Sequence, residues 1–328
     1  MEKTISMTNR KRITFNEFWD KYSTVSILIL MALLFGALEP RAFLNGKNLI
    51  KIVEQSSITI LLACGEFFAI LLAGIDLSVG STMAFTGVIT AKLMVAGYSP
   101  WLAVFIGTLL LGALIGLING LLINITHLPP FIITLGTQSI IRGLTMVVAN
   151  ARTVSGIEIS FVKGIGGKIF GIIPTPILIA LITAGILVFF TTQTQAGRNL
   201  YAIGGNTKSA WFSGINVNLH TAIAFMISGV CSGLAGMVNI ARLAGAEPNA
   251  GTGYETYAIA AVIIGGTSFF GGVGFIPKVV VGGLIIGVIN NGLNMVGVSS
   301  YYQQIAMGAL IIVAVTLDRF FGSSNKSK

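Results

Sequence analysis

The chain has 328 residues, of which 54% are hydrophobic and only 9% are charged. Soluble domains carry about 25% charged residues, so this chain has too little charge to cover a water-facing surface. We therefore expect a membrane protein. The net charge of +9 comes from residues at segment ends rather than on one face, which argues against nucleic acid as a partner.

Ten apolar segments follow one another along the chain, and a membrane helix needs about 20 such residues. They are 22–38, 56–73, 79–97, 101–123, 130–149, 172–192, 219–241, 255–268, 275–296 and 301–317. The eighth is short and runs into glycines, so we expect it to be broken or re-entrant. The runs are too long and continuous for a barrel, and the predicted fold is an all-α polytopic membrane protein of about ten transmembrane helices.

Lysines and arginines outside the spans predict the orientation. The N-terminal arm, 1–21, holds five of them; with that arm in the cytoplasm, the inner side carries ten and the outer side seven. We expect a single transmembrane domain over 22–320 and a cytoplasmic tail over 321–328. The same count places the polar segment 197–217 in the cytoplasm.

Two stretches indicate an internal inverted repeat: "GALIGLINGLLINITHLPPFIITLG" (112–136) and "GGLIIGVINNGLNMVGVSSYYQQIAMG" (282–308). They lie five spans apart, and an odd offset gives opposite orientations, as in many transporters. A rival alignment pairs "GIDLSVGS" (74–81) with "GTSFFGGVG" (266–274) at an even offset. Both cannot belong to one repeat, and we favour the first because it is longer.

No enzyme chemistry is evident in the sequence. "GGTSFFGGVG" (265–274) has the glycine spacing of a phosphate-binding loop, but Gly272 and Val273 stand where Lys and Ser/Thr are needed. We expect a tight cytoplasmic turn there and no ATP site. No cluster has metal-ligand spacing and no Ser-His-Asp grouping is present, so we expect no bound cofactor or metal.

Two carboxylates stand out. Asp76 in "GIDLSVGS" is read as a helix-end turn whose carboxylate accepts backbone N–H bonds, in preference to a pathway acid. Glu66 lies mid-span, where it must face protein or water. It is a structural hydrogen-bond partner, a protonated acid or a pathway residue, and a proton-coupled carrier would need such a group.

Most other polar residues in the spans are neutral. Amides and aromatic rings suit a neutral polyhydroxylated solute, because each amide both donates and accepts; amides also join helices to one another. With Glu66, the substrate-pathway candidates are Asn119, Phe131, Thr134, Gln138, Asn290, Asn294, Tyr301 and Gln304.

The polar segment 197–217, "GRNLYAIGGNTKSAWFSGINV", has the signals of a short rigid helix. Asn206 is the predicted N-cap, 207–213 gives two turns and Gly214 is the predicted stop. Gly197, Gly204 and Gly205 are expected to form turns before it. The adjacent Trp211 and Phe212 face either the lipid interface or a groove on a partner.

Five motifs together resemble the membrane permease of ribose-type sugar ABC importers, which handle ribose, xylose, allose, galactosides and autoinducer-2. They are "GIDLSVGS" (74–81), "FIITLGT" (131–137), the polar segment 197–217, "AGTGYETYAIAAVIIGGTSFFGGVG" (250–274) and "NNGLNMVGVSSYYQ" (290–303). The resemblance implies a bacterial inner-membrane protein that pairs with a second permease copy, as a homodimer or alternatively a heterodimer. It also implies a periplasmic sugar-binding protein and an ABC-type ATPase that binds the ATP and Mg²⁺.

The resemblance makes 197–217 the segment seated in the ATPase, here called the coupling segment. Its candidate contact residues are Gly197, Arg198, Gly204, Gly205, Asn206, Lys208 and Gly214. Ribose and allose are the leading substrates. The alternative is a self-sufficient secondary sugar transporter or channel coupled to protons through Glu66.

Overall fold

The computed structural model describes residues 15–322, and the outer parts of the predicted N-terminal arm (1–14) and C-terminal tail (323–328) lie outside this range. All ten predicted spans fall on helices within it. The helices are α1 (Phe15–Leu38), α3 (Gly46–Leu71), α4 (Val79–Val95), the continuous α5 (Pro100–Val104), η1 (Phe105–Leu110) and α6 (Leu111–Thr126), α7 (Pro130–Ala149), α9 (Thr175–Gln193), α12 (Val217–Leu243), α13 (Tyr254–Ile264), α14 (Ile276–Met295) and α15 (Ser300–Gly322). The all-α polytopic prediction is confirmed.

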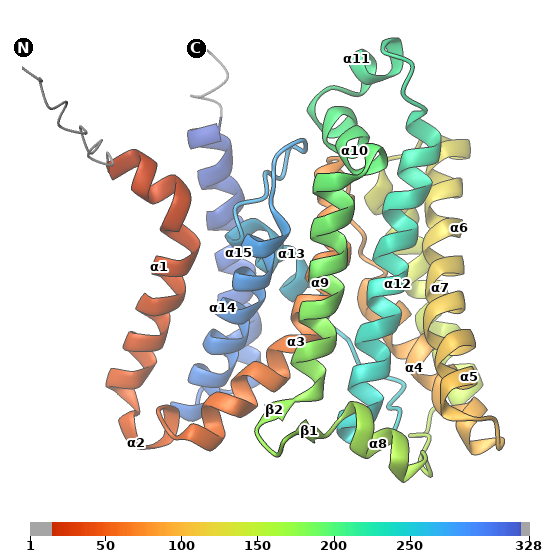
Figure 1. Ribbon diagram of the computed structural model, residues 1–328, viewed down its shortest axis with the longest axis vertical. Coiled ribbons are helices and arrows are strands. Elements are labelled where there is room, and N and C mark those ends of the chain that lie inside the picture. Colours follow the sequence, from red (N-terminus) through yellow and green to blue (C-terminus); the bar gives the residue numbers. More distant parts are fainter. Residues whose placement is uncertain (1–14, 323–328) are drawn as a thin grey trace, which may run out of the picture.

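The remaining elements are short and lie in the connections between these helices (Figure 1). They are α2 (Pro40–Phe43), α8 (Ile159–Ile165), the antiparallel pair β1 (Lys168–Ile169) and β2 (Ile173–Pro174), α10 (Gln195–Gly205) and α11 (Thr207–Phe212). The β pair is in register Lys168 opposite Pro174.

Six helical stretches in the described range are long and apolar enough to cross a bilayer, and α4, α13 and the apolar part of α1 are shorter. The 11 residues of α13 extend about 16 Å, roughly half the hydrocarbon thickness. The eighth span is therefore short, as predicted. Its flanking loops are partly exposed: Thr252 on one side and Phe270 on the other are exposed residues.

Helix α3 begins ten residues before the predicted second span. Asn45 caps its N-terminus by accepting a hydrogen bond from the Lys47 N–H at 3.0 Å, so the polar turns that follow are already helical. An apolar count misses such turns because their side chains are charged, whereas the cap depends only on the backbone.

The helix packing follows the predicted inverted repeat. In the first half α6 and α4 pack on α12, and in the second half their counterparts α14 and α13 pack on α3. Likewise α4 packs on α7, and α13 packs on α15. Helices α3 and α12, themselves counterparts, pack together and are the most buried of the long helices. Each pair is related to its counterpart by an offset of five spans, which supports the alignment of 112–136 with 282–308.

Glycines allow the closest of these contacts. A Cβ on Gly116 of α6 would lie 2.1 Å from the Phe225 carbonyl oxygen of α12, and one on Gly112 would lie 2.5 Å from the Gly229 oxygen. Both distances are far below van der Waals contact, so the α6 and α12 backbones touch directly, as small residues permit in membranes.

The two ends of the molecule differ in what they carry. Helix α1 begins and α15 ends at the same end as α10 and α11, whereas α2, α8 and the β1–β2 hairpin lie at the opposite end (Figure 1). The coupling segment therefore lies at the same end as the start of α1 and the end of α15, as the span count predicts (Figure 1).

Candidate functional site

Asp76 lies in the irregular connection between α3 and α4 and is almost completely buried. Its Oδ1 accepts bonds from the Ser78 N–H at 3.0 Å and the Ser78 hydroxyl at 2.6 Å, and its Oδ2 accepts from the Ser228 hydroxyl of α12 at 2.7 Å. The turn predicted at this residue is confirmed. A buried carboxyl with three donors is well satisfied, and it fixes the connection against α12.

Further bonds extend this arrangement into α6 and α7. The Asn119 amide donates to the Ser78 hydroxyl at 3.0 Å, and the Thr137 hydroxyl donates to the Asn119 carbonyl at 2.6 Å. The Thr134 hydroxyl accepts from the Leu77 N–H and donates to the Ile75 carbonyl. Together Glu66, Asp76, Ser78, Asn119, Thr134, Thr137 and Ser228 form what we call the buried polar network.

Glu66 enters the network from α3. Its Oε1 accepts a bond from the Asp76 N–H at 3.0 Å, while its buried Oε2 has no hydrogen-bond partner in the described part of the chain. Glu255 of α13 is similar: its Oε1 accepts from the Gln138 amide at 3.2 Å and its Oε2 is buried without a partner there. Arg142 donates to the Pro248 and Ala250 carbonyls at 2.8 Å each.

The predicted pathway residues thus separate into two sets. Glu66, Asn119 and Thr134 belong to the buried polar network, and Gln138 lies beside it on α7. The others are more peripheral: Asn290 is partly buried, and the exposed ones are Phe131, Asn294, Tyr301 and Gln304. The Asn294 carbonyl accepts from the Gln303 amide at 2.8 Å, so Asn294 lies beside the start of α15, where Tyr301 and Gln304 are found. Phe131 is separate from them, at the start of α7.

Sequence reasoning missed Ser228, Thr137 and Glu255. Ser228 lies 152 positions from the carboxyl it contacts, and nothing local distinguishes it from the small residues that surround it in α12. Within residues 15–322, no group of three His, Cys, Asp or Glu side chains is placed to hold a metal ion.

The coupling segment forms most of α10 and all of α11. The Asn206 side chain accepts from the Ser209 N–H at 2.9 Å, and Gly214 has a φ of +83° with its N–H bonded to the Trp211 carbonyl. The predicted cap and stop are both confirmed. The side chains of Arg198 and Lys208 are exposed.

One prediction in this segment is wrong. Gly197, Gly204 and Gly205 do not form turns: all three lie inside α10. Two are needed for close packing, because a Cβ on Gly197 would lie 2.3 Å from the Phe190 carbonyl oxygen and one on Gly204 1.9 Å from the Leu71 oxygen. A Cβ on Gly205 would meet nothing within 4 Å.

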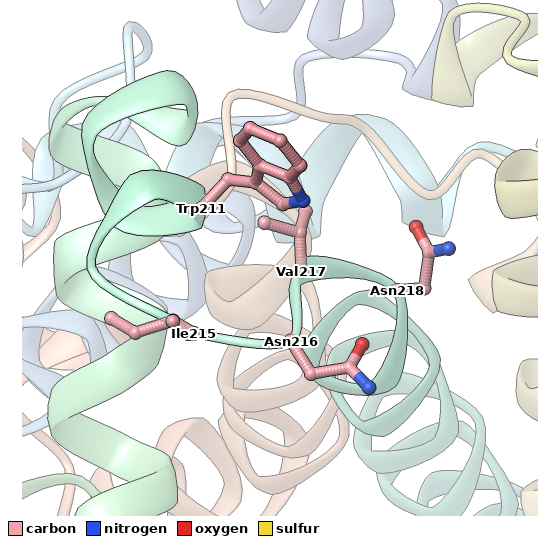
Figure 2. A pocket seen from close by; sticks show the side chains of 6 residues that line it. Trp211, Ile215, Asn216, Val217 and Asn218 are labelled. Carbon is pink, nitrogen blue, oxygen red and sulfur yellow. The ribbon is translucent and has the colours of Figure 1, made fainter.

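Trp211 and Phe212 are 64% and 80% exposed, and their rings contact each other edge to face at a centroid distance of 5.0 Å. Figure 2 shows the Trp211 indole reaching from α11 over the following turn towards Val217, where α12 begins. Helix α11 lies beyond the ends of α9 and α12 (Figure 1). This end of the molecule presents a short, capped helix with two exposed aromatic rings.

The fold is that of a polytopic helical membrane protein with two inverted halves and a projecting pair of short helices. The family model described as branched-chain amino acid transport system, permease component, matches residues 48–315. The chain belongs to this family.

Three relatives illustrate its membership. The chain is 55% identical to the D-allose transport system permease protein of Escherichia coli strain K12 over 95% of both chains. It is 40% identical to the ribose import permease protein of Haemophilus influenzae, over 93% of this chain and 94% of the relative. It is 36% identical to the galactose/methyl galactoside import permease protein of Escherichia coli K12, over 90% and 92%. No solved structure matches the chain.

Proposed function

We propose that this chain is the membrane permease of a bacterial ABC importer that takes up a monosaccharide, with D-allose the first candidate and ribose the second. The observation that carries the proposal is the 55% identity to a D-allose permease over 95% of both chains. The ribose and galactoside permeases at 40% and 36% support the sugar class and favour these sugars less.

The protein spans the inner membrane with its N- and C-termini in the cytoplasm. A second permease copy, identical or related, completes the pathway, and a periplasmic binding protein delivers the sugar. A separate ATPase binds the ATP and Mg²⁺, so this chain is a transport subunit without enzymatic activity or cofactor. The family supports these roles.

The coupling segment docks into the ATPase. Its short capped helix and exposed cations suit a rigid contact. Of its seven predicted contact residues, five are proposed to contact the ATPase: Arg198, Gly205, Asn206, Lys208 and Gly214. Gly197 and Gly204 instead pack against the Phe190 and Leu71 carbonyl oxygens and position α10. Trp211 and Phe212 contact the ATPase rather than lipid, because α11 lies beyond the ends of the spanning helices (Figure 1). Such aromatic anchors commonly dominate binding energy at interfaces.

The substrate pathway runs along the protein from Asn294, Tyr301 and Gln304, around the start of α15, towards the buried polar network. Exposed amides and aromatic rings at Asn294, Tyr301 and Gln304 suit sugar hydroxyls and ring faces. ATP binding draws the ATPases together, the coupling segments move with them, and the permease halves alternate between outward and inward states.

A proton-coupled carrier using Glu66 is the weaker alternative. The Glu66 carboxyl already binds the Asp76 N–H, and the named relatives are transport or import permeases. These observations support a subunit that depends on partners.

Proteoliposomes that contain the permease and its ATPase test the proposal. We expect binding protein loaded with D-allose to stimulate ATP hydrolysis, and unloaded binding protein to do so much less. Ribose and galactose, each presented in turn, rank the substrates. If none of the loaded binding proteins raises the rate of ATP hydrolysis above its basal value, the proposal is contradicted.

A further inference from the structure

Three backbone segments meet near the C-terminal end of α10, within the coupling segment. Gly204 of α10, the Leu71 carbonyl at the end of α3 and Gly272 of the 265–275 connection lie in direct contact. A Cβ on Gly204 would lie 1.9 Å from the Leu71 oxygen and 2.6 Å from the Gly272 nitrogen. A Cβ on Gly271 would likewise lie 2.9 Å from the Leu71 oxygen. We call Leu71, Gly204, Gly271 and Gly272 the glycine joint.

A hydrogen bond and two left-handed residues hold the joint together. The Gly272 N–H donates to the Leu71 carbonyl at 2.9 Å. Gly271 and Gly272 have φ values of +84° and +75°, which other residues rarely adopt. The motif "GGTSFFGGVG" therefore does more than reverse the chain direction. The backbone of its Gly271 and Gly272 packs directly against the backbones of α3 and α10.

The 265–275 connection is also anchored to α10 at a second point and to α15. The Tyr201 hydroxyl of α10 donates to the Gly274 carbonyl at 2.9 Å. The Asp318 carboxylate of α15 accepts from the Phe269 N–H at 3.0 Å and from the Ser268 hydroxyl at 3.2 Å. A displacement of α10 therefore acts on a connection that hydrogen bonds hold in place, rather than on a loop that is free to rearrange.

The chain passes from the joint directly to the buried polar network. Leu71 ends α3, and Asp76 follows five positions later, with Ala73 between them in a left-handed conformation of φ +56°. The stretch from Ile75 to Ser78 is bonded to α7 through Thr134 and to α12 through Ser228. Its bonds leave little freedom to absorb a movement at Leu71.

We infer that the glycine joint transmits movement of the coupling segment to the connection 72–78, and through the hydrogen bonds of residues 75–78 to helices α6, α7 and α12. Leu71, Gly204 and Gly272 act as positioning residues that link the ATPase contact to the buried polar network. This inference rests on the proposed function, because it needs an ATPase that moves the coupling segment. A packed backbone contact suits this role because it has few alternative arrangements.

The test uses the complete importer in lipid nanodiscs. Gly204→Ala places a methyl group against backbone that cannot yield, whereas the control Gly185→Ala adds the same group on α9 where nothing lies within 4 Å. We expect Gly204→Ala to retain the ATPase on co-purification. In this variant, the stimulation of ATP hydrolysis by loaded binding protein falls about fivefold or more. A fivefold effect is the lower end of typical coupling between two sites. Gly185→Ala matches wild type.

Amide hydrogen exchange distinguishes transmission from a general loosening of the fold. In wild type and in Gly185→Ala, a non-hydrolysable ATP analogue changes exchange both at 195–217 and at 72–78. In Gly204→Ala the change persists at 195–217 and is lost at 72–78. Tyr201→Phe removes the bond to Gly274 without adding bulk. We expect it to weaken the exchange response at 72–78 less than Gly204→Ala does, and it replaces Gly204→Ala in the test if that variant does not fold.

Two results would overturn the inference. One is Gly204→Ala with fully stimulated ATP hydrolysis and a wild-type exchange response at 72–78. If Gly204→Ala does not fold, the same result in Tyr201→Phe overturns the inference. The other is a wild-type complex in which the analogue changes exchange at 195–217 and not at 72–78. A wild-type complex whose hydrolysis ignores loaded binding protein would instead refute the proposed function, so the two failures are distinguishable.

Discussion

Asp76 is the polar side chain on which the buried polar network depends. It accepts three hydrogen bonds, from the Ser78 N–H and from the hydroxyls of Ser78 and Ser228. Its own N–H donates to Glu66. One residue thus connects a non-helical segment to α3 through its N–H and to α12 through its carboxyl. Removal of the carboxyl would leave several donors without an acceptor.

We predict that Asp76→Ala destabilises the protein strongly. Each buried donor left unpaired costs about 1–3 kcal/mol, so the melting temperature in detergent should fall by much more than for Asp76→Asn, which keeps one acceptor oxygen. Ser139→Ala serves as the control, because Ser139 is exposed and bonds only to its own helix. Equal melting temperatures for Asp76→Ala and the control would contradict this role.

The sequence reveals some of these residues and not others. The Asp76 turn is predictable, because a short acidic side chain followed by Ser and Gly bonds its own backbone. The Asn206 cap is predictable for the same local reason. Ser228 and Glu255 are not, since their partners are brought to them by helices far apart in the chain.

Among the helices, α6 and α12 make a close contact along a row of glycines. Gly112, Gly116 and Gly120 lie on one face of α6, at spacings of four residues, and the Cβ that each lacks would overlap the backbone of α12. Lipid supplies no hydrophobic force that drives helices together, so their packing rests on such contacts.

We predict that Gly116→Ala lowers the melting temperature, because the new methyl group forces the two backbones apart. Overpacking of this kind costs about 1–3 kcal/mol. The control is Gly143→Ala on α7, where a Cβ meets nothing within 4 Å; alanine favours helix over glycine, so this variant should match or exceed wild type. The reverse order of the two melting temperatures would show that the helices do not pack in this way.

The ten predicted spans were recognisable in order because each contains an apolar run, although the run in α13 is short. Their packing was predictable only where the repeat imposes it. Helix α10 was missed: its three glycines favour turns when read locally, yet the absence of side chains there lets α10 lie against α9, α3 and the 265–275 connection.

The whole molecule has two distinct ends, and its orientation can be measured with single cysteines. Both native cysteines are buried, so a polar maleimide should report added ones. We predict that Ser209→Cys on α11 reacts in inverted vesicles but not in intact spheroplasts. Ile172→Cys, in the β1–β2 hairpin at the opposite end, should react only in spheroplasts. The opposite pattern would invert the orientation proposed for the coupling segment.

The dependence of uptake on a separate ATPase is the central claim at the scale of the whole protein. It is tested most directly by uptake of radiolabelled D-allose in cells that express this permease and its binding protein, with and without the cognate ATPase. We predict accumulation only when the ATPase is present, and none with an ATPase variant that binds but does not hydrolyse ATP. Undiminished accumulation in cells without the ATPase would contradict the account and point instead to a self-sufficient transporter.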